Sequence, residues 1–429
     1  MKRALQKRFE FMNVNLRILT LHQILGMFCR RMVLSYASLY ILAVGGGDAE
    51  IGVVNSLQPL AGLVVFPLAG YLTDRTGRVR LIAFAGYFAA VTTLLYVFAP
   101  SWEWLAFAAL LQGIIVFEFP PLSAILADSL RPHHRGVGIA TMSTLATGFA
   151  IVSPYLAGIT LEYLGDNAGM RLLYAVFTLS YGVSATLILK YLKETTAPTT
   201  TRTPLNVLRV LKDTYTGVPA LIRQLPRSIK ALSVLVGLGF ITNAIISPFW
   251  VVYVTNVIQL SSVEWGLILL LEAIAKTVLT IPCGLLTDRY GRTATLGAAV
   301  VCSLLAMPAL ILAHTFLHVL VIRLGVGLAE ALFLPSSTAL MADYIPRATR
   351  GRVMAAIGRG SVLVGAAGGG TGGPGMGYLF TLPVMVTSVL GGLLYAQNPT
   401  HPWICTLGLT CLQLISLLLF IRDPEHAEQ

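Results

Sequence analysis

Long apolar runs recur along nearly the whole 429-residue chain, separated by short polar stretches. A helix that spans a bilayer needs about 20 mostly apolar residues, because each residue adds about 1.5 Å to its length. Twelve runs meet this length, which predicts twelve spanning helices. They cover about residues 18–43, 51–71, 79–99, 102–126, 136–161, 171–191, 231–255, 264–286, 294–314, 316–341, 353–395 (interrupted) and 402–421.

Composition places the chain in the membrane class. Hydrophobic residues make up 56% of it and charged residues only 11%, whereas soluble domains carry about 25% charged residues. The five cysteines all fall inside predicted spans at unrelated spacings, so we expect neither disulfides nor a metal site. No nucleophile triad or phosphate-binding loop is present, so we expect no enzyme activity and no cofactor.

The distribution of charge predicts how the chain lies in the membrane. If both termini and every second loop are placed on one side, that side holds 24 of the 30 Lys and Arg, and the loops on the other side hold only Arg171 against six acids. Lysine and arginine are retained on the cytoplasmic side, so both termini are predicted to be cytoplasmic. The net charge of +11 therefore reflects topology and does not indicate a nucleic-acid partner.

The sequence repeats itself at half its length. "GYLTDRTGR" at 70–78 returns as "GLLTDRYGR" at 284–292, and "ADSLRPHHRG" at 127–136 returns as "ADYIPRATRG" at 342–351. A Thr-, Pro-, Lys- and Arg-rich stretch, 192–230, separates the halves. We therefore predict an all-α membrane protein of two pseudo-symmetric six-helix bundles, 1–191 and 231–429, joined by a cytoplasmic linker.

These two copies resemble the signature of the major facilitator superfamily, the loop between helices 2 and 3, and the resemblance extends over the whole chain. It implies a secondary transporter, in which matching residues latch the cytoplasmic side shut when the opposite side is open. The gate residues predicted in this way are Gly70, Asp74, Arg75, Gly77, Arg78, Asp128, Arg135, Gly284, Asp288, Arg289, Gly291 and Arg292.

Ionisable residues inside the spans are the best indication of a site, because they nearly always face a bundle interior or an aqueous cavity. The resemblance implies a cavity lined by helices 1, 4, 7 and 10, which carry Arg30, Arg31, Glu118, Arg323 and Glu330. Low-dielectric surroundings favour the neutral form of a carboxyl group, so Glu118 and Glu330 are the candidate proton carriers. The alternative for each is a structural role, which for Glu118 is a permanent ion pair with an arginine.

Helical spacing divides the arginine pair of helix 1. Arg31 shares a face with Ser35 and Ser38, which suits a wet cavity, whereas Arg30 points about 100° away and is expected to pair with Glu118. On helix 8, Glu272 and Lys276 have the spacing of a structural ion pair.

Two further stretches add to the candidate site. Asn243 and Trp250 share a face of helix 7 and could contact an organic solute, or Trp250 could be an interfacial anchor. The Gly-rich stretch 365–377 belongs to an excess of about nineteen residues near helix 11 relative to the first half. It either interrupts the helix inside the protein or forms a cytoplasmic loop before it.

The sequence thus predicts a monomeric plasma-membrane carrier that moves a small organic solute by alternating access, coupled to protons, with export favoured. The surplus of positive charge in the spans favours an anionic or zwitterionic substrate. Ala109, Ser153 and Ala157 depart from the signatures of drug–proton antiporters, although Gln112 and Gly113 match. A lipid-like or amphiphilic substrate and a transporter-like receptor are the alternatives.

Overall fold

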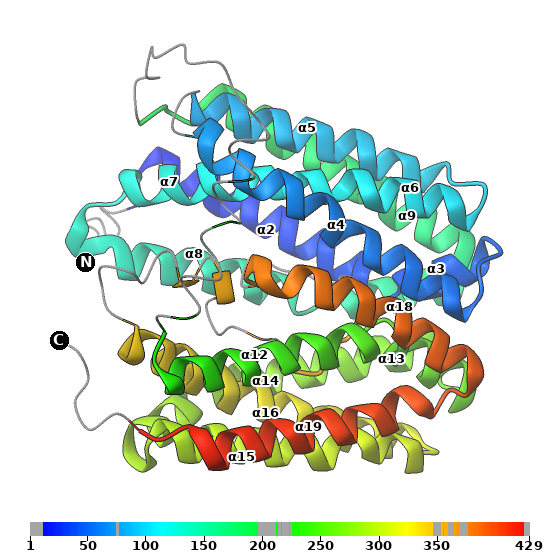
Figure 1. Cartoon of the computed structure of the whole chain (residues 1–429). Helices are drawn as coiled ribbons and strands as arrows, with labels where there is room; N and C mark the ends of the chain where they lie inside the picture. The colour runs from blue at the N-terminus through cyan, green and yellow to red at the C-terminus, as the bar shows by residue number, and fades with distance from the viewer. Residues whose placement is uncertain are drawn as a thin grey trace, which may run out of the picture.

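The computed structural model describes residues 12–73, 77–195, 212, 216, 223, 225–345, 353–354, 356–358, 362, 364–368 and 376–423. Over these residues the chain is helical, apart from one isolated antiparallel bridge between Gly358 and Met376. The helices lie roughly parallel in two groups, α2 to α9 and α12 to α19, which form the two layers seen in Figure 1. We call them the N bundle and the C bundle.

The N bundle comprises helices 1 to 6. Its elements are α2 (Val14–Leu34) and α3 (Ala37–Ala43) for helix 1, α4 (Asp48–Thr73), α5 (Arg78–Val97), α6 (Trp102–Gln112) with the 3₁₀ turn η1 (Gly113–Glu118) and α7 (Phe119–Ser129) for helix 4, the short turn η2 (Pro132–His134), α8 (Arg135–Ala150) and α9 (Ser153–Tyr191).

The C bundle comprises helices 7 to 12. Its elements are α12 (Arg227–Ile246), α13 (Phe249–Val252) and the π-helical turn η3 (Tyr253–Val257) for helix 7, α14 (Ser262–Tyr290), α15 (Arg292–Ala306) with η4 (Pro308–Leu312), α16 (Phe316–Tyr344), η5 (Tyr378–Phe380) with α18 (Thr381–Gln397), and α19 (His401–Phe420).

The described helices account for the twelve predicted spans. Nine are long and apolar enough to cross a membrane, and the bent pair α2 and α3 makes ten. One of the nine runs from Pro132 to Tyr191 and contains two spans, which meet at Gly165, where φ is +75°. The 26-residue α4 supplies the remaining span. Helix 1 bends by 49° between α2 and α3.

The repeat seen in the sequence is also a repeat of contacts. The chain just after α9 meets the start of α5, where Glu194 accepts from the Val79 N–H (3.1 Å). The end of α19 similarly meets the start of α15, where Thr293 N–H donates to Asp423 (2.9 Å). In each bundle the chain that follows the last helix therefore lies beside the start of the third helix, at the end on the left of Figure 1. We call it the terminal end, and the other the distal end.

Glycines bring the two bundles into close contact near the distal end. A Cβ on Gly52 of α4 would lie 2.5 Å from the Ser388 carbonyl of α18, and one on Gly392 would lie 3.1 Å from the Gly52 Cα. Ser388 also donates to the Gly52 carbonyl (3.1 Å). Backbones can approach this closely only where side chains are absent.

A second contact of the same kind joins α9 to α14. A Cβ on Gly158 would lie 2.3 Å from the Ser262 carbonyl, and one on Gly266 would lie 2.7 Å from the Pro154 carbonyl. Between them the Tyr36 hydroxyl of helix 1 lies 3.0 Å from the Pro154 carbonyl and 2.8 Å from that of Ser262. A single hydroxyl thus ties both bundles together at this end.

Replacing Gly158 by Val tests whether this contact holds the distal end closed. The added side chain has no space, and overpacking costs about 1–3 kcal/mol, so we expect the ratio of closed to open forms to fall roughly fivefold or more. Spin-label distances between the distal ends of α9 and α14 measure this ratio. Gly148→Val is the matched control, since nothing lies within 4 Å of a Cβ there. Equal distance distributions in the two variants would contradict the assignment.

Candidate functional site

At the terminal end, each copy of the repeated motif forms an ion pair inside its own bundle. Arg78 contacts Asp128 in the N bundle, and Arg292 contacts Asp343 in the C bundle. Both join the start of the third helix of a bundle to the end of the fourth. Asp343 was not among the predicted gate residues, although the alignment of "ADSL" with "ADYI" matches it to Asp128.

Carboxylates complete this arrangement at the helix starts. Glu194 accepts from the Val79 N–H (3.1 Å) at the start of α5, and Asp423 takes the same place at α15. The partial positive charge of a helix N-terminus stabilises a carboxylate there. The Arg78–Asp128 and Arg292–Asp343 pairs of the motif thus tie helices together within each bundle.

The other predicted gate residues differ in what is described of them. Asp74 and Arg75 lie outside the described residues, and of Gly70 only its place in α4 is described. Arg135 donates to the Ala127 carbonyl (3.2 Å). Gly77 and Gly291 precede α5 and α15, and Gly291 has a φ of +91°. Gly284, Asp288 and Arg289 belong to the last turns of α14, where Asp288 is exposed.

In the C bundle, Arg323 of α16 is buried and fully surrounded by partners. Its guanidinium forms two parallel hydrogen bonds with Glu272 of α14, both 2.8 Å, and Nη1 donates to the Gly365 carbonyl (2.8 Å). The guanidinium carbon lies 4.4 Å from the ring centre of Trp250 and 5.8 Å from that of Trp265. The two-pronged geometry and the ring faces both suit arginine better than lysine.

The second carboxylate of helix 10 is also paired. Glu330, two turns after Arg323, receives a hydrogen bond of 3.0 Å from Lys276 of α14. The expected pairing of Glu272 with Lys276 along helix 8 is therefore replaced by two pairs that cross to helix 10. Both pairs join α14 to α16. Sequence spacing within one helix cannot reveal which sides of two helices face each other.

The Gly-rich segment enters the C bundle as far as it is described. Val362 and Val364 are buried, Ala366 N–H donates to Asn243 Oδ1 (3.2 Å), and Gly368 N–H donates to the Ser247 carbonyl (3.0 Å). The bridge between Gly358 and Met376 shows that the chain leaves and returns at one point beside helix 11. The described part thus matches the first alternative, an interruption inside the protein.

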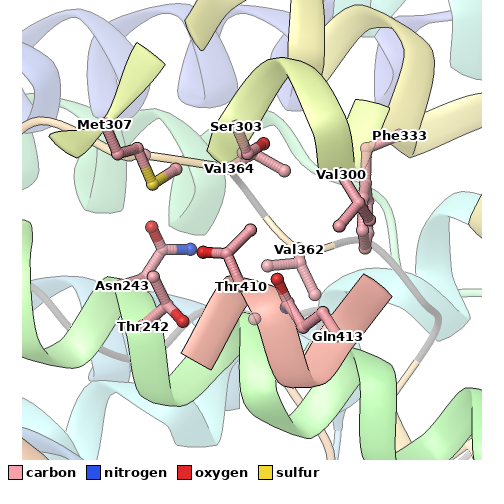
Figure 2. A pocket seen from close by; sticks show the side chains of 12 residues that line it. Thr242, Asn243, Val300, Ser303, Met307, Phe333, Val362, Val364, Thr410 and Gln413 are labelled. Carbon is pink, nitrogen blue, oxygen red and sulfur yellow. The ribbon is translucent and has the colours of Figure 1, made fainter. Parts of the chain in front are cut away.

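This segment occupies the place expected for substrate contacts on helix 7. Asn243 binds the backbone of Ala366, and Trp250, fully buried, packs edge-on against Trp403 at 4.5 Å between ring centres. A small cavity remains beside Asn243, of about 20 Å³. Figure 2 shows Asn243 and Thr410 pointing toward one another across it. That volume holds about one water molecule, so this cavity is too small for an organic solute.

In the N bundle, Glu118 has a partner that the sequence did not suggest. It ends the 3₁₀ turn η1 before Pro120 and Pro121, and its Oε1 lies 3.0 Å from His22 Nε2 of helix 1. The other ring nitrogen of His22 lies 2.7 Å from the Ser184 hydroxyl of α9. The expected partner, Arg30, forms no ion pair with Glu118. His22 could have been suspected as the one histidine well inside a predicted span.

Arg30 and Arg31 are half-buried on α2, and neither has an ion-pair partner among the residues that the structure describes. Ser35 and Ser38, beyond them on helix 1, are buried. Ser35 donates to the Arg31 carbonyl (2.8 Å), and its own carbonyl accepts from Trp265 Nε1 (3.4 Å). The two guanidiniums therefore carry the excess positive charge of this part of the protein.

The comparisons with known proteins agree with this architecture. The model of the Major Facilitator Superfamily matches residues 19–235 and 232–429. The multidrug resistance protein MdtG of Enterobacter lignolyticus is 24% identical over 332 residues, 75% of this chain and 76% of its own. The multi-drug resistance efflux pump PmrA of Streptococcus pneumoniae is 23% identical over 354 residues, 80% of this chain and 84% of its own.

Solved structures share the fold. A mutant of the nucleoside transporter NupG superposes with a TM-score of 0.69 at 13% identity, covering 95% of this chain and 99% of its own. The human organic anion transporter MFSD10 superposes with a TM-score of 0.61 at 15% identity, covering 94% and 99%. The chain belongs to the major facilitator superfamily. It is a multi-pass membrane transporter of the twelve-helix, two-bundle type, and not an enzyme.

The pair of Arg323 and Glu272 should matter strongly for stability. Removing one partner of a buried ion pair leaves an uncompensated charge, which costs on the order of 3–5 kcal/mol. We expect Glu272→Gln to lower the thermal unfolding temperature in detergent, measured with a thiol dye that reacts with the buried Cys29 and Cys283 on unfolding.

Two controls give this measurement its meaning. Glu103→Gln changes a carboxylate in the exposed first turn of α6 and should leave the transition in place. The double change Glu272→Leu and Arg323→Met removes both charges and should recover part of the loss. An unaltered transition in Glu272→Gln would show that the pair contributes nothing to stability.

Proposed function

We propose that this protein is a proton-coupled carrier that moves small organic solutes across the plasma membrane by alternating access, in the direction of export. In this proposal residues 1–191 and 231–429 are the two moving bundles, 192–230 is the linker, and the terminal end faces the cytoplasm. The positive charge of the loops at that end supports the orientation. The two multidrug resistance relatives favour export of organic solutes.

The observation that supports proton coupling is that the carboxylates inside the membrane have different kinds of partner. In the part of the chain that the structure describes, Glu272 is held by an arginine and Glu330 by a lysine, whereas Glu118 faces a histidine. Arginine stays charged at any pH a cell reaches, but histidine changes charge near neutrality. Glu118 is therefore the proton carrier in this proposal, and Glu330 is a structural residue.

Alternating access follows from where the bundles touch. The glycine contacts of α4 with α18 and of α9 with α14 lie near the distal end, and the ion pairs at the terminal end stay within their bundles. We assign this arrangement to the state closed toward the outside. In the opposite state, the members of the gate motif would close the cytoplasmic side between the bundles.

The substrate is recognised mainly by the N bundle. The C-bundle side is filled by the segment 364–368, which binds Arg323 and Asn243 through its backbone. The half-buried Arg30 and Arg31 are left to face a solute. Guanidinium groups bind carboxylates and phosphates through paired hydrogen bonds, so an anionic or zwitterionic solute fits best. The name of the structural neighbour MFSD10, an organic anion transporter, agrees with this class.

Transport itself is tested with purified protein in liposomes under an imposed pH gradient. Carboxyfluorescein serves as an anionic probe, ethidium as a cationic probe and a fluorescent lysophospholipid as an amphiphile. We expect gradient-driven movement of carboxyfluorescein above that of protein-free liposomes. Movement of the lysophospholipid alone would establish the lipid alternative, and binding without movement of any probe would establish a receptor.

Glu118→Gln should abolish the response of transport to the pH gradient, because glutamine cannot bind the proton, while exchange of probe at equal pH persists. Glu330→Gln is the matched comparison and should keep the gradient response, even where the loss of the Lys276 partner lowers stability. The measurement is initial probe flux with and without the gradient. A gradient response that survives in Glu118→Gln would reject Glu118 as the carrier.

Arg31→Gln should raise the apparent KM for carboxyfluorescein by about tenfold or more, which corresponds to about 1.4 kcal/mol of binding. Arg30→Gln should have a smaller effect, because its direction on α2 differs by about 100°. Ethidium flux should not fall in either variant, since no favourable contact with a cation is lost. Equal KM values in Arg31→Gln and the unmodified protein would remove Arg31 from the binding site.

A further inference from the structure

His22 and Glu118 face each other across the N bundle from helices that are far apart in the sequence. His22 Nε2 lies 3.0 Å from Glu118 Oε1, and the two side chains are 12% and 9% exposed. Both side chains are thus mostly buried. A histidine beside a carboxylate is the group whose charge changes most readily near neutral pH.

The opposite side of the imidazole is adapted to both charge states. His22 Nδ1 lies 2.7 Å from the Ser184 hydroxyl. When the ring is neutral with its proton on Nε2, Nδ1 accepts from that hydroxyl. When the ring is protonated on both nitrogens, the same hydroxyl rotates and accepts from Nδ1–H. Ser184 therefore offers His22 a hydrogen bond in either charge state. A backbone carbonyl in its place could only accept, so it could not bond to an unprotonated Nδ1.

The surroundings contain few competing charges. Among described groups, Tyr181 of α9 lies close enough to interact with Glu118 and with Arg30 and Cys29 of α2. The neighbouring helices α4, α5 and α8 carry Asp, Glu, Lys, Arg or His only in their first turns. No second carboxylate is described beside the pair that would take the proton instead.

We propose that His22 and Glu118 bind the transported proton together, and that the Ser184 hydroxyl reorients when the charge of His22 changes. This proposal rests on the proposed proton coupling and names the residues that bind the proton. A proton from the aqueous side adds to the pair, and no other bond forms or breaks. Its departure to the opposite side leaves the carboxylate beside a neutral imidazole.

The break in helix 4 places Glu118 on an irregular turn of the backbone. Pro120 and Pro121 follow Glu118 at the start of α7, and the turn before them is a 3₁₀ helix. Proline prevents a regular α-helical ladder through this point. Glu118 is thus placed on an irregular turn packed against α4 and α5, whereas His22 and Ser184 lie on regular helices. A small movement of that turn changes the distance of the carboxylate from His22.

The first test uses no substrate. Nitrogen-15 histidine NMR of the purified protein in lipid nanodiscs follows the charge of the ring, and the His22 signal is identified by its loss in His22→Gln. We expect His22 to titrate between pH 5 and 9, with a midpoint that moves by about one pH unit or more in Glu118→Gln. His318→Gln changes an exposed histidine at the start of α16 and should leave the midpoint unchanged.

Two NMR results would overturn the proposal. One is a His22 signal that keeps the same charge throughout this pH range, which indicates a permanent structural pair. The other is a titration of His22 that is identical in Glu118→Gln and the unmodified protein. Ser184→Ala provides an independent check, because losing the hydroxyl should also displace the midpoint without changing either member of the pair.

The second test is the pH profile of probe flux in liposomes. His22→Gln should displace the profile by about one pH unit or more, and a smaller displacement is expected for Ser184→Ala. Flux with an unchanged profile in His22→Gln would overturn the role of His22. If the liposomes move no probe at all, the proposed transport function fails, and the NMR titration still decides whether the pair binds a proton.

Discussion

A charge inside a membrane is costly unless it is paired with an opposite charge or faces an aqueous cavity. This constraint determines which helices of this protein are bound to one another. Arg323 and Glu272 form an ion pair that holds α16 to α14. Lys276 and Glu330 form a second pair between the same two helices, further along each of them. His22 and Glu118 connect helix 1 to helix 4 in the other bundle. The two arginines of helix 1 are the charges that these pairs leave over, which is why recognition of a solute is assigned to them.

The two bundles differ in what they offer for mechanism. The C bundle is filled, because the segment 364–368 lies among its helices and supplies backbone groups to Arg323 and Asn243. Its two ion pairs join one carboxylate to an arginine and the other to a lysine. The N bundle holds the histidine–carboxylate pair and, within the described part of the chain, two guanidiniums without an ion-pair partner. The proposed function therefore assigns proton and substrate binding to the N bundle and a supporting role to the C bundle.

Contacts between the bundles are made by groups that can separate without leaving a charge behind. Gly52, Gly158, Gly266 and Gly392 contribute only backbone, and Tyr36 contributes one hydroxyl. Strong pairs such as Arg78 with Asp128 and Arg292 with Asp343 remain inside each bundle. Rigid-body rocking requires strong contacts within each bundle and weak contacts between the bundles, because the surfaces that move apart then break few polar contacts.

The sequence by itself determined the twelve spans, the two halves and the family, because apolar length, the distribution of Lys and Arg and the repeated motif are all local patterns. It also identified Arg30, Arg31, Glu118, Arg323 and Glu330 as the costly charges. It could not determine their partners, because a partner on another helix depends on how the helices rotate and pack. Helical spacing suggested Glu272 with Lys276 and Arg30 with Glu118, whereas packing chose Arg323 for Glu272, Glu330 for Lys276 and His22 for Glu118. Only the tertiary structure brings residues 22 and 118 to within 3.0 Å of each other, and the proposed chemistry of this protein depends on that contact.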